Sequence, residues 1–585
     1  MSSGPPTPYR ELTAVGLIVG VLFGVVMTAS FVYVALRLGF TIPGSTVAAI
    51  LGFAVLRGVL RRSSIIENNI NQTVASGVNS SSAGVAFTLP ALFILAHDDP
   101  TLRGFDILPI LLAAMGGAFL GVAFIVPLRK QIIELERLRF PSGIAVASLL
   151  RSPGAAMRQA VLLGAGFAVA AAFHAAIQLE WMPEELDATT ALGLPPYVPV
   201  ALAVTFAMLG AGLLSGRGGL PFVFGGVLSW WVLSPLAVAF GWVPSAAQLS
   251  LPADVAATAY PLWLRDAVIY GQMLRPLGIG VLIGGALSGV VASFPAVRAA
   301  FRSLTAATRS GAGSDEIDPR VLYVGVGLSF VVLLAASLLS GQGITLARAL
   351  LISVVGTAWI GVAGLVVAQA TGMTDIIPVS GMSLVGVTLM YFLSGGNVIA
   401  SIILGVAVSM GLGQVGDMMT DLKAGHLIGA MPRRQQAAQL FLSWIGVPVA
   451  VGAVYLLWRG FDAPGFGVPG ADLPAPQGNA LAAVIRGLRD GAAPVDKYLA
   501  GTAIGLGLGA FPVGGTGVLV GLAMYLPFSV TVTYAVGCLA SMALRAWHGA
   551  RWIGETLVPV AAGFIIGEAL TNLTAVILKL ALGEA

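Results

Sequence analysis

Long hydrophobic segments alternate with short polar ones over nearly the whole chain. A helix needs about twenty apolar residues to cross the hydrocarbon layer of a bilayer. About seventeen windows of that length occur, near residues 12–38, 41–60, 70–96, 105–128, 157–179, 196–215, 219–242, 272–296, 320–341, 344–370, 377–393, 395–413, 436–458, 496–511, 512–527, 528–546 and 552–582. A transmembrane β-barrel would instead show alternating segments of about ten residues. The pattern therefore predicts an all-α polytopic membrane protein with about 16–17 transmembrane helices.

The composition agrees with a membrane protein and argues against several other classes. The 585 residues are 57% hydrophobic and 10% charged, whereas about a quarter of the residues in a soluble protein are charged. The net charge of +4 comes from basic residues in the short loops between hydrophobic segments, so we expect no nucleic acid as a partner. Cys538 is the single cysteine, which excludes an intrachain disulfide and a multi-cysteine metal site. We predict no metal site and no cofactor.

The distribution of basic residues predicts the orientation, because loops rich in lysine and arginine stay in the cytoplasm. Such residues follow the second, fourth and eighth hydrophobic segments: Arg57, Arg61, Arg62, Arg129, Lys130, Arg137, Arg139, Arg151, Arg158, Arg298, Arg302 and Arg309. The acidic loop after the fifth segment is expected outside. Residues 1–11 then form a cytoplasmic tail, which leads into a segment too long for a signal peptide. Abundant alanine and glycine, with more arginine than lysine, indicate a bacterial inner (cell) membrane.

Two short motifs recur at one offset and suggest an internal duplication. Ile42-Pro43-x-Ser45 returns as Ile377-Pro378-x-Ser380, and the Pro-x-Gly-x-Ala-x-Ala pattern from Pro141 returns from Pro476, in both cases 335 residues later. We therefore expect a first transmembrane repeat over 12–305, a linker with a connecting span over 306–346, and a second repeat over 347–585. The repeats are inverted if the connecting segment crosses the membrane and all eight earlier spans are real. They are parallel if one candidate is not a span.

The most polar interval inside a hydrophobic region is 414–436, which reads QVGDMMTDLKAGHLIGAMPRRQQ. Asp417 and Asp421 are four residues apart, so a helix would place both carboxylates on one face. Such a pair can titrate, bind a cation or hold an ammonium group. The glycines of this interval suggest a broken or re-entrant helix that offers free backbone groups to a ligand. We take Asp417, Asp421 and Lys423 as candidate site residues.

A polar stripe in the first half is the second candidate region. Asn68, Gln72, Ser76 and Asn79 are spaced four, four and three residues apart, so they share one face of a helix. A stripe of amides facing lipid would lack partners, so we expect it to line the bundle interior or a watery cavity. The alternative for each single residue is a contact that holds two helices together. Glu67, just before the stripe, is either a helix-start carboxylate or a proton carrier.

Glu568 is a third candidate, because it lies deep in the last hydrophobic segment, where an ionised group needs a partner. His426 could move protons near neutral pH. The chain contains no GxxxxGK[ST] motif and no HExxH motif, so nothing in it predicts an ATP-driven pump or a zinc protease.

These stretches resemble the oligopeptide transporter (OPT) family, which includes the yellow-stripe-like metal-chelate transporters. The strongest likeness is the DLKAGHLIGAMPRRQQ segment from Asp421, which is similar to a DLKTGYLLGATPRKQQ type of motif. The segments Glu67–Gln72, Pro141–Ala145, Tyr525–Ser529 and Gly563–Glu568 are similar to other family signatures. The chain departs from the family pattern at His426, where an aromatic residue is usual. The resemblance, that of a bacterial-type member, covers nearly the whole length.

The resemblance implies a proton-coupled symporter of small oligopeptides or peptide-like metal chelates, with about sixteen spans that arose by duplication. We expect alternating access around a cavity, with Glu67, Asn68, Gln72, Asn79, Asp417, Asp421, Lys423 and Glu568 along the substrate and proton pathway. Glu67, Asp417 and Asp421 are the candidates for proton coupling. The partners are then the substrate, protons and the lipid bilayer; the oligomeric state is open, with a homodimer as one option.

A membrane enzyme is the alternative from another class. Asp417-x-x-x-Asp421 has the form with which intramembrane prenyltransferases hold Mg²⁺ on a diphosphate. Those enzymes need a second aspartate-rich motif, and none follows at a suitable place in this sequence. A channel is a third interpretation, which the lack of a recurring short filter motif disfavours.

Overall fold

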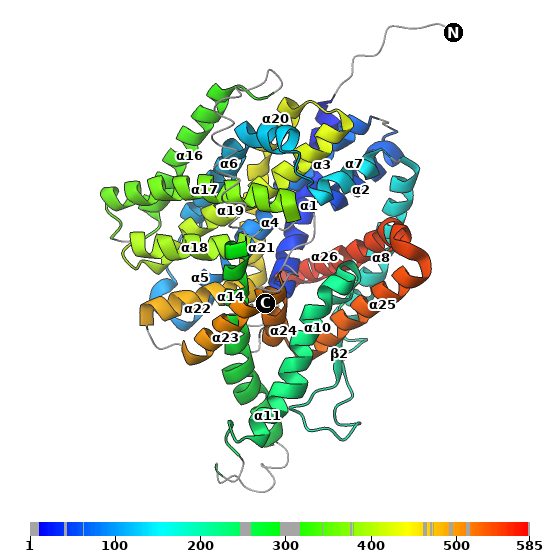
Figure 1. Cartoon of the computed structure of the whole chain (residues 1–585), viewed down its shortest axis with the longest axis vertical. Coiled ribbons are helices and arrows are strands. Elements are labelled where there is room, and N and C mark those ends of the chain that lie inside the picture. Colours follow the sequence, from blue (N-terminus) through cyan, green and yellow to red (C-terminus); the bar gives the residue numbers. More distant parts are fainter. Residues whose placement is uncertain are drawn as a thin grey trace. The chain divides into compact units, whose positions relative to one another are not determined.

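The computed structural model describes residues 11–39, 44–61, 64–151, 153–245, 248, 259–292, 316–341, 343–374, 377, 379–459, 465–468, 471, 473–490, 495–509 and 515–582. Within them, helices form the regular structure, apart from one two-stranded ribbon and one isolated bridge (Figure 1). The predicted helical class is therefore confirmed. Two compact units make up the chain. Unit 1 comprises Met1–Ala35, Phe40–Val161 and Ser293–Leu456, and unit 2 comprises Leu36–Gly39, Leu162–Ala292 and Leu457–Ala585.

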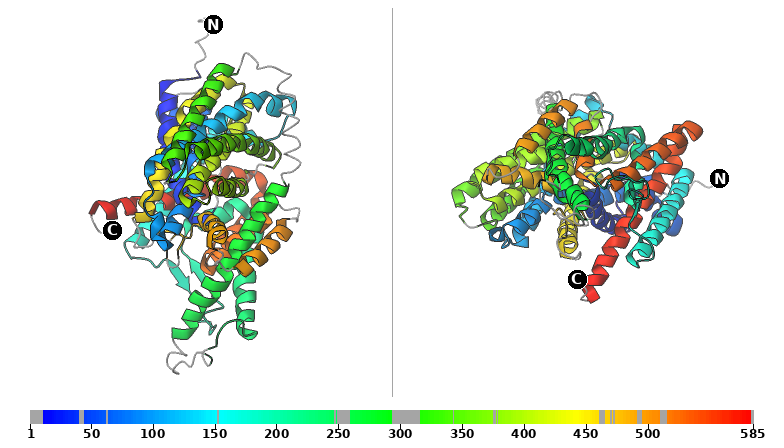
Figure 2. Two further views of the ribbon diagram at one scale, coloured as in Figure 1. Left: turned by 90° about the vertical axis from the view of Figure 1, so that its left-hand side faces the viewer. Right: turned by 90° about the horizontal axis from the view of Figure 1, so that it is seen from below.

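Unit 1 is organised around α19 (Val398–Ile428), a 31-residue helix that is buried over most of its length. Its neighbours come from both halves of the sequence: α2 (Gly44–Phe53), α3 (Ile65–Asn79), α4 (Ser81–Ala86), α5 (Pro90–Asp98), α6 (Ile107–Ile125), α7 (Pro141–Leu150), α16 (Pro319–Leu339), α17 (Leu346–Thr374), α18 (Val379–Leu393) and α20 (Pro432–Leu442) (Figures 1 and 2). The other long helices that begin in this unit are α1 (Ala14–Leu38), α8 (Pro153–Gln178) and α21 (Gly446–Arg459). A helix that carries Gln414 and Asp421 needs such neighbours, because lipid offers no partners for these polar side chains.

Unit 2 contains two groups of packed helices. In one group, α14 (Arg275–Ala292) contacts α22 (Pro476–Asp490), α23 (Val495–Gly509) and α24 (Thr516–Tyr525). In the other, α9 (Phe206–Ser215) contacts α25 (Phe528–Trp552) and α26 (Val558–Leu582). The shorter helices of the unit are α10 (Leu220–Val227), α11 (Ser234–Ala239) and α13 (Ala259–Trp263). Helix α10 contacts both α24 and α25 and so joins the two groups.

Eleven helical stretches in the described residues are long and apolar enough to cross a membrane. The protein is therefore an integral membrane protein, as the hydrophobic pattern predicts. Eleven is fewer than the predicted number of spans, for two main reasons. Some predicted spans are shorter apolar helices, such as Gly44–Val59, Val379–Leu393 and Thr516–Tyr525. Two others, 528–546 and 552–582, belong to one stretch, Phe528–Leu578, which bends at Gly549 where φ is 82°.

The polar interval 414–436 contains one helix break, at Gly429, and is helical without a break through Asp417 and Asp421, so the break expected at Gly416 and Gly425 is wrong. Helix α19 runs through Asp417 and ends only at Gly429, whose φ of 80° lies in the left-handed region that glycine adopts easily. Gly416 and Gly425 serve close packing instead. A Cβ atom added at Gly416 would lie 2.6 Å from Ile377 Cδ1, and one at Gly425 would lie 1.9 Å from Gln435 Oε1.

Helices are interrupted elsewhere, mostly by π-helical turns. Such turns follow α2 at Ala54–Val59 and precede α14 at Leu264–Leu274. Others lie at Lys130–Leu135, Leu228–Leu233 and Ile553–Leu557. Wider turns of this kind are frequent where a helix carries out a function.

Strand β1 of the two-stranded ribbon lies in the acidic loop predicted to be external, whereas β2 occupies the first part of the predicted span 196–215, which becomes helical only from Phe206. Strand β1 (Glu185–Asp187) pairs antiparallel with β2 (Ala201–Ala203). The Thr189 amide donates to Asp187 Oδ1 at 2.7 Å, and this bond, with the Thr189 side chain, lowers the pKa of the Asp187 carboxyl below its usual value. The ribbon leads directly into Thr205, which caps α9 by accepting from the Met208 amide.

Glycine lets α6 and α19 approach until their backbones touch. A Cβ atom added at Gly117 would lie 2.0 Å from the carbonyl oxygen of Ala407, and one at Gly121 would lie 2.2 Å from that of Gly411. Such contacts replace the hydrophobic effect as the force between helices in lipid, where apolar side chains gain nothing by leaving the solvent.

We predict that Gly117→Ala lowers the thermal unfolding temperature of the detergent-purified protein. The new methyl group overlaps the Ala407 carbonyl, and overpacking of this kind costs roughly 1–3 kcal/mol. Gly164→Ala on α8 is the matched control, because an added Cβ there meets nothing within 4 Å. Equal unfolding temperatures for the two variants would contradict the proposed contact.

Candidate functional site

Asp421 lies inside unit 1, on the face of α19 that meets α2 and α3. Its side chain is completely buried. Gln72 Nε2 of α3 donates to Asp421 Oδ1, and Ser45 Oγ of α2 donates to the same oxygen at 2.8 Å. The second oxygen, Oδ2, has no hydrogen-bond partner in the described residues. The carboxylate is therefore held by neutral donors on one side only.

The polar stripe of α3 is closed off by α2. Ser45 Oγ lies 3.0 Å from Ser76 Oγ, and Asn68 Nδ2 donates to the carbonyl of Ala49 at 3.5 Å. Two small residues of α2 allow this approach. A Cβ atom added at Gly52 would lie 2.6 Å from Asn68 Oδ1, and one at Gly44 would lie 2.5 Å from Asn79 Nδ2. Every residue of the stripe is at most 5% exposed, so the stripe is occluded in this conformation.

Glutamine side chains tie α19 and α20 to α3. Gln435 Nε2 donates to Thr73 Oγ1 at 2.9 Å and to the backbone carbonyl of Asp421 at 3.1 Å. Gln414 Nε2 donates to the carbonyl of Gly77 at 2.7 Å. Beside Gln435, Gln436 donates to Glu316, at the start of the connecting span. The two adjacent glutamines of the DLK…QQ segment therefore hold different parts of unit 1.

Several buried polar atoms of α19 and of the segments packed against it have no hydrogen-bond partner within the described part of the chain. They are Asn68 Oδ1, Asn69 Oδ1 and Nδ2, Asn71 Oδ1, Gln72 Oε1, Ser80 Oγ, Ser81 Oγ, Asp421 Oδ2 and Gln439 Oε1. We call this group, together with Ser45 and Ser76, the Asp421 cluster. Most of its free atoms are carbonyl or carboxylate oxygens. A buried oxygen without a donor costs roughly 1–3 kcal/mol, so the cluster lacks donors.

The remaining candidates of unit 1 lie at the edges of this cluster. Asp417 is one turn before Asp421 on α19, on the same face as predicted, and is partly exposed. Lys423 follows Asp421 by two residues, which places it about 200° around the helix. The stem of Lys423 packs on α7, where a Cβ atom added at Gly143 would lie 3.1 Å from its Cβ. Asp421 and Lys423 therefore do not face one common pocket.

Glu67 occupies the first turn of α3. Ser64 caps this helix and accepts a hydrogen bond from the Glu67 amide at 3.2 Å, the spacing of a capping box. Thr13 Oγ1, just before α1, donates to Glu67 Oε1. This is the helix-start position that the sequence allows for Glu67, and here the carboxylate also joins α3 to α1.

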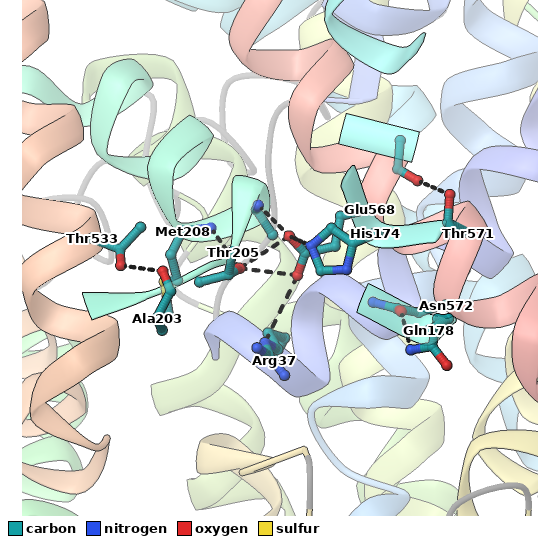
Figure 3. A network of polar contacts seen from close by, with 12 residues as sticks. Arg37, His174, Gln178, Ala203, Thr205, Met208, Thr533, Glu568, Thr571 and Asn572 are labelled. Atoms are coloured by element: carbon teal, nitrogen blue, oxygen red, sulfur yellow. Dashed lines mark hydrogen bonds and ion pairs between the residues drawn. The ribbon is translucent and has the colours of Figure 1, made fainter. Parts of the chain in front are cut away.

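Glu568 belongs to unit 2 and is surrounded by donors (Figure 3). Thr205 Oγ1 donates to its two oxygens at 2.9 and 3.0 Å, and the Ala207 amide donates to Oε2 at 2.7 Å. His174 Nε2 lies 2.8 Å from Oε2, and Arg37 Nε lies 3.9 Å from Oε1. The carboxylate is completely buried at the N-terminus of α9, where the helix dipole favours a negative charge. We call these five residues the Glu568 centre.

The sequence pattern identifies Gln72, which contacts Asp421, but not the other partners of these two carboxylates. Ser45 stands in one of the duplicated motifs and Gln435 in the DLK…QQ segment, but neither was chosen as a site residue. His174 and Arg37 could be predicted as partners of a carboxylate, because an ionisable side chain within or at the end of an apolar segment needs a partner. Thr205 could not be predicted as a partner, since hydroxyl residues are common next to helix starts.

Comparison with known proteins shows relatives along nearly the whole chain. Residues 11–579 match the family described as OPT oligopeptide transporter protein. A candidate oligopeptide transporter of Haemophilus influenzae is 26% identical, over 92% of this chain and 91% of its own length. Metal-nicotianamine transporter YSL2 and iron-phytosiderophore transporter YSL15 of Oryza sativa subsp. japonica are each 25% identical over 98% of this chain, and over 93% and 92% of their own lengths.

We predict opposite effects on stability for two substitutions of Asp421. Asp421→Asn keeps an acceptor for Gln72 and Ser45, removes a buried charge and adds a donor, so thermal stability should stay equal or rise. Asp421→Ala leaves both donors unpaired, at a cost of roughly 1–3 kcal/mol. Thermal unfolding of the two purified variants measures the difference. An Asn variant as unstable as the Ala variant would mean that Asp421 is stabilised by a cation.

Proposed function

The chain belongs to the OPT oligopeptide transporter family, and from this premise we propose that it is a secondary active transporter of small oligopeptides or peptide-like metal chelates. In this proposal the substrate moves with protons, by alternating access, across a bacterial cell membrane. The names of the relatives include both substrate classes. Family membership also decides against the prenyltransferase alternative for Asp417 and Asp421, because the family is one of transporters and not of enzymes.

The observation that carries the proposal is the excess of free acceptors in the Asp421 cluster. A peptide or an amino-acid-derived chelator carries ammonium or amine groups, and an ammonium group brings three donors. Such a group would supply the positive charge and the donors that Asp421 Oδ2 and Gln72 Oε1 lack. Charge-assisted hydrogen bonds of this type are about twice as strong as neutral ones.

A proton is the other way to neutralise Asp421. Within the described residues its oxygens are met only by neutral donors and by the negative charge of Asp417, so an ionised Asp421 opposes burial. Protonation on one side of the membrane would permit the occluded conformation, and release on the other side would reverse it. This supports Asp421, rather than the helix-start residue Glu67, as the carboxylate of unit 1 whose protonation alternates with substrate binding.

We also propose that the two halves of the chain arose by duplication. Helices α2 and α18 begin at Gly44 and Val379, and helices α7 and α22 begin at Pro141 and Pro476. Both pairs of starts keep the 335-residue offset of the recurring motifs. The proposed topology places residues 1–11 in the cytoplasm, and either inverted or parallel repeats fit it.

We predict that Asp421→Asn abolishes proton-driven uptake in proteoliposomes. The amide cannot carry a proton and cannot attract an ammonium group, although it retains the hydrogen bonds to Gln72 and Ser45. Uptake would be measured with labelled di- and tripeptides and with iron–nicotianamine, each with and without an inward acidic gradient. Glu184→Gln, which removes an exposed carboxylate of the loop before β1, is the control and should transport normally.

Thermal shifts with the same compounds separate binding from coupling, because a bound substrate stabilises the folded protein by mass action. Stabilisation by peptides or by chelates identifies the substrate class. Uptake by Asp421→Asn at the rate and pH dependence of the unsubstituted protein would remove Asp421 from the mechanism. Failure of both substrate classes to stabilise or enter would overturn the proposed function.

A further inference from the structure

We propose that His174 and Glu568 form a proton-carrying pair in unit 2, in which His174 changes its charge and Glu568 stays ionised. This proposal rests on the proposed proton-coupled transport, and it adds a proton site that is separate in sequence and in partners from the Asp421 cluster.

The neighbours of Glu568 stabilise its ionised form. It accepts hydrogen bonds from the Thr205 hydroxyl and from the Ala207 amide, and these two donors are fixed by the first turn of α9. The guanidinium of Arg37 lies 3.9 Å from Oε1 and supplies a permanent positive charge, because arginine does not lose its proton in proteins. These donors and the positive charge favour the ionised form of the carboxylate over the protonated form.

His174 is the group in the centre whose charge can change. Its Nε2 lies 2.8 Å from Glu568 Oε2, without the alignment of a full hydrogen bond, and its buried Nδ1 has no hydrogen-bond partner in the described residues. The Nε2 nitrogen can keep its proton toward Glu568 in both states. The proton that comes and goes is then the one on Nδ1.

Binding of this proton changes the net charge of the Glu568 centre. With neutral His174, the positive Arg37 balances the negative Glu568, and the centre carries no net charge. Uptake of one proton from water by Nδ1 forms imidazolium and leaves the centre with one positive charge, and release returns the proton to water. In an apolar interior a net charge is strongly unfavourable, so this change of one charge can favour one conformation over another.

The surroundings contain no further titratable partner among the described contacts. Thr205, Ala207 and the backbone of α9 are neutral, and Arg37 is the only other charged group that touches Glu568 there. Three aromatic rings pack together on the same helices: Phe206 lies 5.1 Å from Phe173 and 5.0 Å from Phe564, between ring centres.

Helices α8 and α26 also carry a neutral pair one turn away from His174 and Glu568, and this pair serves as an internal control. Gln178 follows His174 by four residues on α8, and Asn572 follows Glu568 by four residues on α26 (Figure 3). Gln178 Nε2 donates to Asn572 Oδ1 at 3.1 Å. This neutral pair also joins α8 to α26 but has no group that titrates, so it separates the effect of helix packing from the effect of charge.

The test is His174→Gln, whose side-chain amide can still donate toward Glu568 but cannot be protonated. We expect substrate exchange at equal pH on both sides to continue within about twofold of the unsubstituted rate, while stimulation by an inward acidic gradient is lost. Substrate-induced proton flux, followed with a pH-sensitive dye, should fall to the level of empty liposomes. Gln178→Ala should keep both the gradient stimulation and the pH profile, even where its unfolding temperature is lower.

Arg37→Gln is a second test that does not alter the histidine. Removing a positive charge next to His174 favours the imidazolium, so the pH profile of uptake should shift to higher pH. Gradient-driven uptake by His174→Gln at the unsubstituted level, an unshifted profile for Arg37→Gln, or the same loss of coupling in Gln178→Ala would each overturn the proposal. Absence of substrate exchange in the unsubstituted protein would instead contradict the proposed function.

Discussion

A buried carboxylate in an apolar interior needs something positive or donating beside it, and this protein meets that requirement in two opposite ways. Glu568 has a hydroxyl, a backbone amide, an imidazole and a guanidinium around it, with one or more donors at each oxygen. Asp421 has two neutral donors on one oxygen and none on the other within the described residues. The first arrangement is complete without a ligand, and the second is completed by a proton or by a cationic ligand.

Both arrangements depend on helices that approach very closely. Gly44 and Gly52 bring α2 against the amides of α3, and this contact is what carries Ser45 to Asp421. Gly117 and Gly121 bring α6 against α19, the helix on which Asp421 lies. Small residues thus hold the buried polar groups at hydrogen-bonding distance, which larger residues on α2 would prevent. The abundance of glycine in the sequence is explained by these contacts more than by flexibility.

The hydrophobic pattern was sufficient for the class of fold, because a run of about twenty apolar residues has few other uses. It was insufficient for the number and shape of the spans, since a π-helical turn or a bend such as that at Gly549 leaves hydropathy unchanged. Gly429 does end α19, but Gly416 and Gly425 lie inside the helix, because tight packing there outweighs the unfavourable effect of glycine in an isolated helix.

Only part of the candidate site could be predicted from the sequence. Helical spacing identifies residues that share a face of their own helix, so the stripe from Asn68 to Asn79 and the pair Asp417 and Asp421 could be found. Periodicity says nothing about which distant helix a face meets. The bond between Gln72 and Asp421 joins residues separated by 349 positions, and the ion pair of His174 with Glu568 joins helices from opposite ends of unit 2's sequence. Such pairs follow only from the packed structure.

The contrast between the two carboxylates also bears on how protons and substrate could be coupled. An ammonium group that binds to Asp421 takes the place of the proton that would otherwise neutralise it, because both satisfy the same charge. A site with Asp421 alone would therefore exchange a proton for an amine, and it would not carry the two together. Net movement of protons with the substrate requires a second group whose charge is independent of the amine. The Glu568 centre has the composition for this role, since Arg37 already balances Glu568 and leaves His174 to gain or lose a proton without a substrate contact.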